Sequence, residues 1–252
     1  TINTTGAQSY SGATTLVRDT VLTAGGVNFV GALDSASSTA RALSVNSSGA
    51  TTFGGAVGAT HALSSLTTNA GGTVAVNGGA VTTTGTQNYG EAMTLGAATT
   101  LNASGVTFGN TVNGSGSLSV NGPVTMNGGS VTTAGTQTYN SAVTLGADTS
   151  LTATVGTVSF VSITDGAASF NLDVNSASAL VLNDVTIHGD LHTTTKDVGV
   201  SQATGTRLDI GGASRFTAAG NSIPAQTTPQ NAAISNAANR LVGTVTFDEI
   251  AR

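Results

Sequence analysis

The apolar residues of this chain occur in very short runs, in which apolar and polar side chains alternate. A period of two is the pattern of a β-strand with one buried face. Turn-forming residues, mostly Gly and Asn, separate one run from the next. The predicted strands include Met93–Leu95, Val106–Phe108, Leu118–Val120, Val124–Met126 and Val131–Thr133. We therefore expect an all-β fold made of many short strands.

Asn-Gly pairs lie between several of these strands, at Asn113-Gly114, Asn121-Gly122 and Asn127-Gly128. In an antiparallel sheet such pairs form two-residue hairpins, which is the strongest alternative on local chemistry. Strands of three residues form poor hairpins, however, and the corners of a parallel coil use Asn and Gly for the same left-handed backbone conformations. We therefore predict stacked parallel coils, with Gly-Gly pairs such as Gly128-Gly129 at their corners.

The sequence repeats with a period of 50 residues. The stretch from Gly85 to Tyr89 recurs from Gly135 to Tyr139, and a third copy runs from Gly6 to Tyr10. The match includes flanking residues, pairing Gly78–Thr83 with Gly128–Thr133 and Met93–Ala97 with Val143–Ala147. A fixed period of this length indicates a β-solenoid. We expect one elongated domain over residues 1–252, with 50-residue repeats over 1–163 and more irregular windings over 164–252.

Within this rod we expect Val, Ala, Leu and Ile to fill the interior, and Thr, Ser and Asn to face outward. Two or three windings per repeat give about 20 residues per winding. With stacked strands about 4.8 Å apart, the rod would be about 60 Å long. Tyr10, Tyr89 and Tyr139 share one position of the repeat. We expect a stacked packing position at a corner rather than a carbohydrate-binding ladder.

The composition excludes several classes of partner. Only 8% of the residues are charged and the seven basic residues are scattered, so no phosphate-binding surface for nucleic acid is expected. Cys is absent, which excludes disulfides and Cys-based metal sites. Because no apolar run reaches roughly 18 residues, we expect no membrane insertion. The chain has no initial Met, and Thr1–Thr5 fits the middle of a repeat, so we expect a fragment of a larger protein.

Four short units follow one another in the repeat: Gly-x-Gln-x-Tyr, Val-Thr-Leu, Thr-x-Leu and Val-x-Phe. This order resembles the repeats of filamentous-haemagglutinin-like exoproteins and related giant bacterial adhesins. Residues 208–223 and 234–245 resemble further units of that family. The resemblance implies a right-handed parallel β-helix, export across the outer membrane of a Gram-negative bacterium, and a secreted, cell-surface role in adhesion or matrix building. The 50-residue repeat departs from the pattern after Ile163.

One segment is a candidate for chemistry. His188, Asp190 and His192 have the spacing i, i+2, i+4, which places three side chains on one face of an extended strand, where they could hold a divalent metal. The alternative, which we favour, turns Ile187 and Leu191 inward and leaves the polar trio facing water. The other acidic residues are spread too thinly for acid–base cleavage of a polysaccharide. We predict no catalytic residue, no cofactor and no metal.

Several functions are compatible with this sequence. The leading prediction is an adhesin or filament shaft, not an enzyme, that meets a host or neighbouring cell surface, a matrix or a glycan receptor. The alternative is a self-assembling extracellular fibre, because uncapped windings expose backbone groups for end-to-end association. More remote are a polysaccharide lyase or hydrolase and a solenoid that binds ice or polysaccharide. The last is suggested by Thr82–Thr84 and Thr193–Thr195, although the Thr residues do not recur in one register along all repeats.

Overall fold

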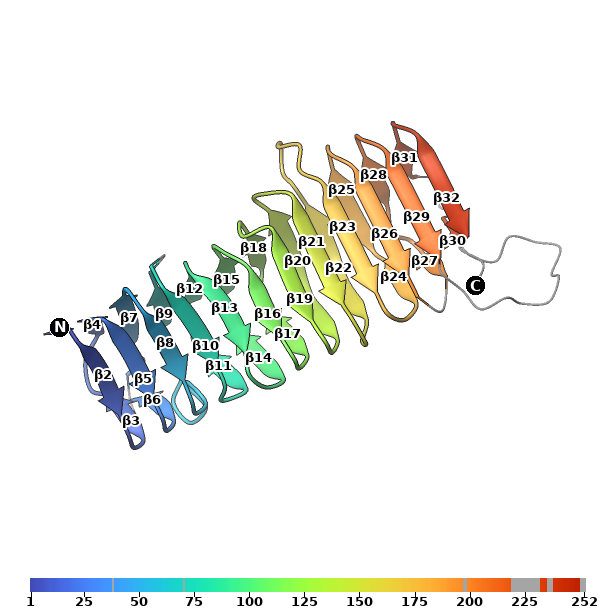
Figure 1. Cartoon of the computed structure of the whole chain (residues 1–252). Helices are drawn as coiled ribbons and strands as arrows, with labels where there is room; N and C mark the ends of the chain where they lie inside the picture. Colours follow the sequence, from blue (N-terminus) through green and yellow to red (C-terminus); the bar gives the residue numbers. More distant parts are fainter. Residues whose placement is uncertain (38, 70, 197–198, 219–231, 235–237, 250–252) are drawn as a thin grey trace.

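The chain folds into an elongated stack of parallel coils, which Figure 1 shows from β1 at one end to β32 at the other. The computed structural model describes residues 1–37, 39–69, 71–196, 199–218, 232–234 and 238–249. These residues form about 11 turns without a helix, and neighbouring strands in each sheet are parallel. The prediction of an all-β parallel solenoid is confirmed, and the hairpin alternative is wrong.

Three strands make one turn, so the rod has three faces, called A, B and C in chain order. Face A contains β1 (Ile2–Asn3), β4 (Thr20–Ala24), β7 (Ala42–Ser47), β9 (Ser65–Thr68), β12 (Thr86–Tyr89), β15 (Gly105–Phe108), β18 (Val124–Met126), β25 (Asp184–Ile187), β28 (Leu208–Ile210) and β31 (Arg240–Leu241). Face B contains β2 (Ala7–Tyr10), β5 (Gly26–Phe29), β8 (Ala50–Phe53), β10 (Thr73–Val76), β13 (Ala92–Leu95), β16 (Val112–Gly114), β19 (Ser130–Thr133), β21 (Thr149–Ala153), β23 (Leu172–Ser176), β26 (Leu191–Thr195), β29 (Ser214–Ala218) and β32 (Val245–Glu249).

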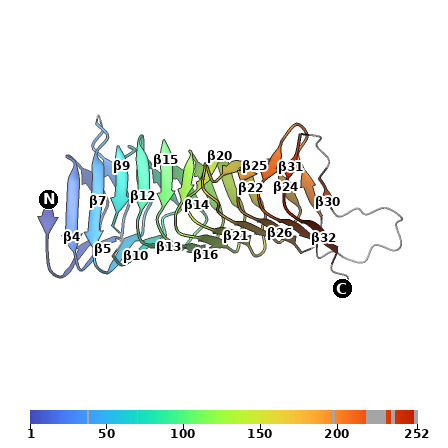
Figure 2. The same ribbon diagram turned by 90° about the horizontal axis from the view of Figure 1, so that it is seen from above.

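Face C contains β3 (Thr14–Leu16), β6 (Leu33–Ser35), β11 (Ala80–Thr82), β14 (Thr99–Asn102), β17 (Leu118–Asn121), β24 (Leu180–Leu182), β27 (Val200–Gln202) and β30 (Ala232–Ala233). Two longer strands, β20 (Gln137–Leu145) and β22 (Val158–Thr164), bend and belong to face C with their first halves and to face A with their second halves. Figure 2 shows strands of faces A and B succeeding one another along the rod.

One turn commonly takes nineteen residues. Val74 pairs on face B with Met93 one turn later, and the same step leads on to Val112 and Val131. Other turns are longer, since 23 residues separate Leu151 from its partner Val174. The 50-residue repeat therefore corresponds to two and two-thirds turns, not to a whole number of windings. Corresponding residues of two copies therefore cannot stack on one another along the rod.

The three copies of the Gly-x-Gln-x-Tyr unit lie on three different faces. Tyr10 belongs to β2 on face B, Tyr89 to β12 on face A, and Tyr139 to the part of β20 on face C. The prediction that they occupy one stacked corner position is wrong. Each tyrosine lies within a strand, and Tyr89 and Tyr139 are completely buried in the core. Tyr89 and Tyr139 are two and two-thirds turns apart, and Tyr10 and Tyr89 are three and two-thirds turns apart, so each copy is carried to another face.

Each copy nevertheless builds a related hydrogen-bonded unit around its Gln, which we call the Gln box. In the first copy, Gln8 Nε2 donates to the Thr23 carbonyl oxygen and to Thr4 Oγ1. In the third copy, Gln137 Nε2 donates to the carbonyl oxygens of Val131 at 3.0 Å and Thr152 at 2.8 Å, and Gln137 Oε1 accepts from Tyr139 Oη at 3.0 Å. The second copy, built on Gln87 and Tyr89, has corresponding bonds.

The Gln box satisfies polar groups that would otherwise be buried without partners. Its two carbonyl acceptors, Val131 in β19 and Thr152 in β21, belong to neighbouring strands of consecutive turns, so one side-chain amide joins two turns. The second acceptor is always 15 residues beyond the Gln, as for Gln8 with Thr23 and Gln87 with Asn102. Gln87 and Gln137 are themselves fully buried, and their amides are completely used. The box therefore works at any of the three corners of the rod.

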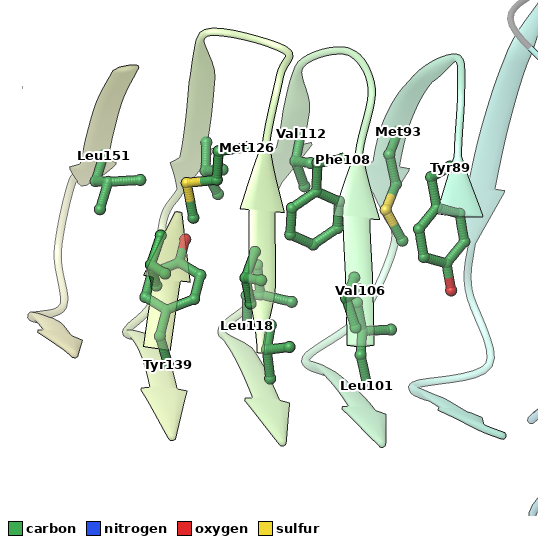
Figure 3. Packing of buried hydrophobic residues seen from close by; sticks show 14 of the residues in the cluster. Tyr89, Met93, Leu101, Val106, Phe108, Val112, Leu118, Met126, Tyr139 and Leu151 are labelled. Carbon is green, nitrogen blue, oxygen red and sulfur yellow. The ribbon is translucent and has the colours of Figure 1, made fainter. Parts of the chain in front are cut away.

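The core is a continuous column of apolar side chains from all three faces. Figure 3 shows Tyr89, Phe108 and Met126 entering this interior from successive strands of face A. The rings of Tyr89 and Phe108 stack with centroids 6.1 Å apart. A second aromatic stack on face B joins Tyr10, Phe29 and Phe53. Because each inward side chain packs on its counterpart one turn away, the buried interior runs along the rod.

Candidate functional surface

The structure separates the three residues of the predicted metal site. His188 follows the end of β25, Asp190 precedes β26, and His192 lies within β26, with Gly189 in the intervening corner. The three side chains therefore do not share one face of a strand, and the prediction that they could hold a metal together is wrong. Ile187 and Leu191 are both buried, as the alternative expected.

His188 contacts a buried carboxylate from the preceding turn. Its Nδ1 lies 2.9 Å from Asp165 Oδ1, and its amide donates to Asp165 Oδ2 at 2.7 Å. The Phe170 amide also donates to Oδ2, at 3.2 Å. A carboxylate that holds an imidazole is a common way to orient a base or a metal ligand. Here it also holds the corner, because Asp165 Oδ2 accepts from the amides of Phe170 and His188. The described residues contain no group of three or more His, Cys, Asp or Glu that could hold a metal ion.

The Asp190 carboxylate also serves a corner. Its Oδ1 accepts from the Ala213 amide at 2.7 Å, and its own amide donates to Asn171 Oδ1 at 2.8 Å. Asn171 in turn donates its amide to Asp148 at 2.9 Å, which produces a ladder along the corner between faces A and B. His192 lies on face B, with Nδ1 3.4 Å from Asp173 Oδ1.

The role of Asp165 was not predicted, although the spacing of polar residues along the chain carries a signal for it. Asp165 and His188 are 23 residues apart, and so are Asp148 and Asn171, and Asp190 and Ala213. This is the length of the longer turns, so a carboxylate at a corner faces the backbone of the next corner. The signal can be read only once the turn length is known.

The outward surface of face A carries a ladder of threonines. Thr107, Thr125, Thr144, Thr164 and Thr186 are successive partners in the parallel pairing, so their hydroxyl-bearing side chains succeed one another along the rod. The row does not extend along the whole rod, because Asn88 precedes Thr107 in this column and Asp209 follows Thr186, as expected for Thr residues that do not recur in one register along all repeats. The neighbouring outward column is mixed, since Ala142, Ser162 and Asp184 follow one another there. The row of threonines is therefore a single residue wide. It does not form an extended two-dimensional array of hydroxyl groups.

An asparagine ladder runs beside it, along the corner between faces C and A. Asn140 Nδ2 donates to Asn121 Oδ1, and Asn121 Nδ2 donates to Asn102 Oδ1, both at 2.7 Å. Asn102 also donates to Thr82 Oγ1 at 3.2 Å. These amides stabilise the corner and leave a neutral, hydrogen-bonding surface.

A shallow groove of about 470 Å³ lies at the corner between faces A and B in the first turns. It is lined by hydroxyl, amide and backbone groups, including those of Thr4, Thr23, Asn46, Ser48 and Asn69. The described lining includes no charged side chain.

Glu91 is the buried carboxyl whose charge the fold opposes most clearly. It lies between β12 and β13 with 1% of its surface exposed, and among the described residues neither carboxyl oxygen has a hydrogen-bond partner. Burial raises the pKa of Glu91 above its ordinary value of 4.5. The Thr68 hydroxyl and the Glu91 amide lie near enough to oppose the rise in pKa without reaching hydrogen-bond geometry.

Replacing Glu91 by Gln is expected to raise the free energy of unfolding by about 1 kcal/mol at pH 7 to 8, because the neutral amide removes a buried charge. A raised pKa means that the folded state binds the proton more tightly than the unfolded state does. Wild-type stability should therefore be fullest below pH 4.5 and fall as pH rises towards the folded-state pKa of Glu91. Urea unfolding of both proteins from pH 4 to 8 measures this. An equal difference at every pH would contradict the assignment.

Comparisons with protein-family models, with curated proteins and with solved structures found no match. None of the described segments forms a helix with the length and apolarity that a membrane crossing requires.

Proposed function

We propose that this chain is a rigid shaft segment of a secreted bacterial surface protein, and that its outward faces meet a partner surface without catalysing a reaction. The supporting observation is the set of parallel ladders on three faces around a continuous apolar core. In this arrangement each turn is held by the turns before and after it along the axis. The molecule is therefore long and stiff.

The outward chemistry supports an adhesive role. The threonine ladder on face A, the asparagine ladder beside it and the neutral groove near Asn46 offer hydroxyl and amide groups in fixed positions. Fixed groups lose little conformational freedom when they bind, which favours many weak polar contacts with a glycan or a matrix surface. The resemblance of the repeats to bacterial adhesins supports the extracellular location.

Removing hydroxyl groups from face A is expected to weaken adhesion several-fold. Thr107, Thr125, Thr144 and Thr186 would be replaced together by Val, which keeps the shape and strand preference of Thr but removes its hydroxyl. Beads coated with wild-type or variant chain would be tested for retention on epithelial cells, on extracellular matrix and on immobilised neutral glycans. The matched control replaces Thr52, Thr94, Thr132 and Thr194 on face B by Val.

Retention of wild-type beads with loss in the face A variant supports the proposal, provided that circular dichroism shows equal folding. Wild-type beads that bind none of these surfaces would contradict the adhesive role. Equal losses in both variants would show that no particular face carries adhesion.

A further inference from the structure

Glu91 places a carboxyl group inside the middle of the rod. It lies in the corner between β12 and β13, where Figure 3 labels Tyr89 and Met93 on either side of the corner. Glu91 is 1% exposed, and in the described part of the chain neither carboxyl oxygen has a hydrogen-bond partner. The hydroxyl of Thr68, on the preceding turn, is also buried and also unpartnered among the described residues. Three oxygen atoms are therefore buried here without a donor.

The backbone brings these oxygen atoms together. Thr68 pairs with Tyr89 in the parallel ladder of face A, and the Gly90 amide donates to the Thr68 carbonyl oxygen at 3.2 Å. The Thr68 hydroxyl lies near enough to Glu91 to lower the pKa of its carboxyl against the effect of burial. On the other side, the Gly109 amide donates to the Tyr89 carbonyl oxygen at 2.7 Å. The corner is thus enclosed by the turns before and after it.

No opposite charge accompanies Glu91 within the described structure. None of the ion pairs among the described residues includes it. The sequence has no Lys or Arg between Arg41 and Lys196. Arg41 directly precedes a strand of face A, whereas Glu91 follows the end of one, and Lys196 lies several turns further along the rod. A carboxylate that is buried without an opposite charge is unfavourable, because nothing offsets its loss of solvation.

The other copies of the repeat show that folding does not require this carboxyl. Glu91 follows the Tyr of its Gly-x-Gln-x-Tyr unit by two residues, and the corresponding residues are Gly12 and Ser141 in the other two copies. Both of those copies build a Gln box without an acidic residue at this position. A side chain that opposes the stability of the fold, and that the fold does not need, is typical of a binding site.

We propose that Glu91 and Thr68 bind a monovalent metal cation, Na⁺ or K⁺, inside the rod. Carboxylate and hydroxyl oxygens are ligands of hard cations. A single positive charge balances the single carboxylate, whereas a divalent ion would leave a net charge in a buried place. The ion joins two consecutive turns through their side chains. This inference does not depend on the adhesive role of the outward faces.

The test measures urea unfolding at pH 8 in NaCl, KCl, CaCl₂ or tetramethylammonium chloride at equal ionic strength. The urea midpoint of the wild type is expected to be higher in NaCl or KCl than in tetramethylammonium chloride, and to rise with the concentration of the metal salt. A ligand that binds only the folded state has this effect. Glu91→Gln should have the same midpoint in all four salts. The gain in stability expected above for Glu91→Gln applies to the tetramethylammonium salt, in which the wild-type charge is unbalanced.

Two further variants separate the site from general effects of salt. Thr68→Val keeps the shape of Thr68 and the carboxyl of Glu91 but removes one ligand, so several-fold more NaCl should be needed for the same shift in midpoint. Asp173→Asn is the matched control, because the Asp173 side chain is 51% exposed on face B, and the wild-type response should persist. Sodium NMR gives a readout besides stability: the folded wild type should broaden the resonance, and Glu91→Gln should not.

Three results would overturn the proposal. The first is a wild-type midpoint that is equal in the alkali-metal and tetramethylammonium salts, because a proton would then neutralise Glu91. The second is an equal shift in Glu91→Gln, which would place the effect of the salts elsewhere. The third is a shift with CaCl₂ alone, which would contradict the balance of one carboxylate by one positive charge.

Discussion

Replacing Gln137 by Met is expected to lower the free energy of unfolding by about 3–6 kcal/mol. Met has nearly the length and shape of Gln, so the change removes hydrogen bonds and leaves packing largely intact. Three buried groups then lose their partner: the carbonyl oxygens of Val131 and Thr152, and the hydroxyl of Tyr139. A buried polar group without a partner costs about 1–3 kcal/mol. The measurement is the free energy of unfolding in urea, followed by circular dichroism.

Tyr139→Phe is the matched control for this result. It removes only the hydroxyl group and leaves the two bonds from Gln137 to the backbone in place. We expect it to cost about 1–2 kcal/mol. If Gln137→Met cost no more than Tyr139→Phe, the link between consecutive turns would not be the main contribution of the Gln box.

Gly128→Ala is expected to lower the free energy of unfolding by about 3 kcal/mol. Gly128 lies at the corner between β18 and β19, directly over the corner of the preceding turn. A Cβ atom there would come within 2.0 Å of the carbonyl carbon of Asn110 and 2.1 Å of its oxygen. Both are backbone atoms, so two stacked turns would have to separate locally. Urea unfolding measures the loss.

Gly12→Ala provides the comparison, because Gly12 lies at an exposed corner where a Cβ would meet no atom within 4 Å. Its effect should stay within about 0.5 kcal/mol. A similar loss in both variants would contradict the role of close stacking, because Gly12→Ala meets no neighbouring atom and its reduced freedom in the unfolded chain favours folding.

The sequence was sufficient to predict the fold class and which side chains point into the core or outward. Both follow from the alternation of apolar and polar residues within each short strand. Val124 and Met126, for example, are buried on either side of an outward Thr125. The three-residue runs also excluded hairpins correctly. The arrangement of the repeats could not be predicted, because it depends on the exact length of a turn. At 19 residues per turn, the positions of Tyr89 and Tyr139 fall on different faces. An approximate turn length of about 20 residues, which is all that the sequence predicts, does not specify on which face each tyrosine lies.

The same limit explains the outcome at the proposed metal site. The spacing of His188, Asp190 and His192 would share one face only within an unbroken strand, and the corner at Gly189 interrupts it. The partner of His188 is Asp165, one long turn away. Contacts between turns are set by corner lengths, which vary along this chain. Alternation within a strand carries no information about them.

The occurrence of three copies of this unit has a geometric consequence for the surface of the rod. The outward threonines Thr15, Thr94 and Thr144 occupy equivalent places in the three copies, and they point away from the axis on faces C, B and A respectively. A residue that is duplicated with the unit is thus distributed around the whole circumference. Each of the three faces therefore presents one copy of this threonine, at a different height along the rod.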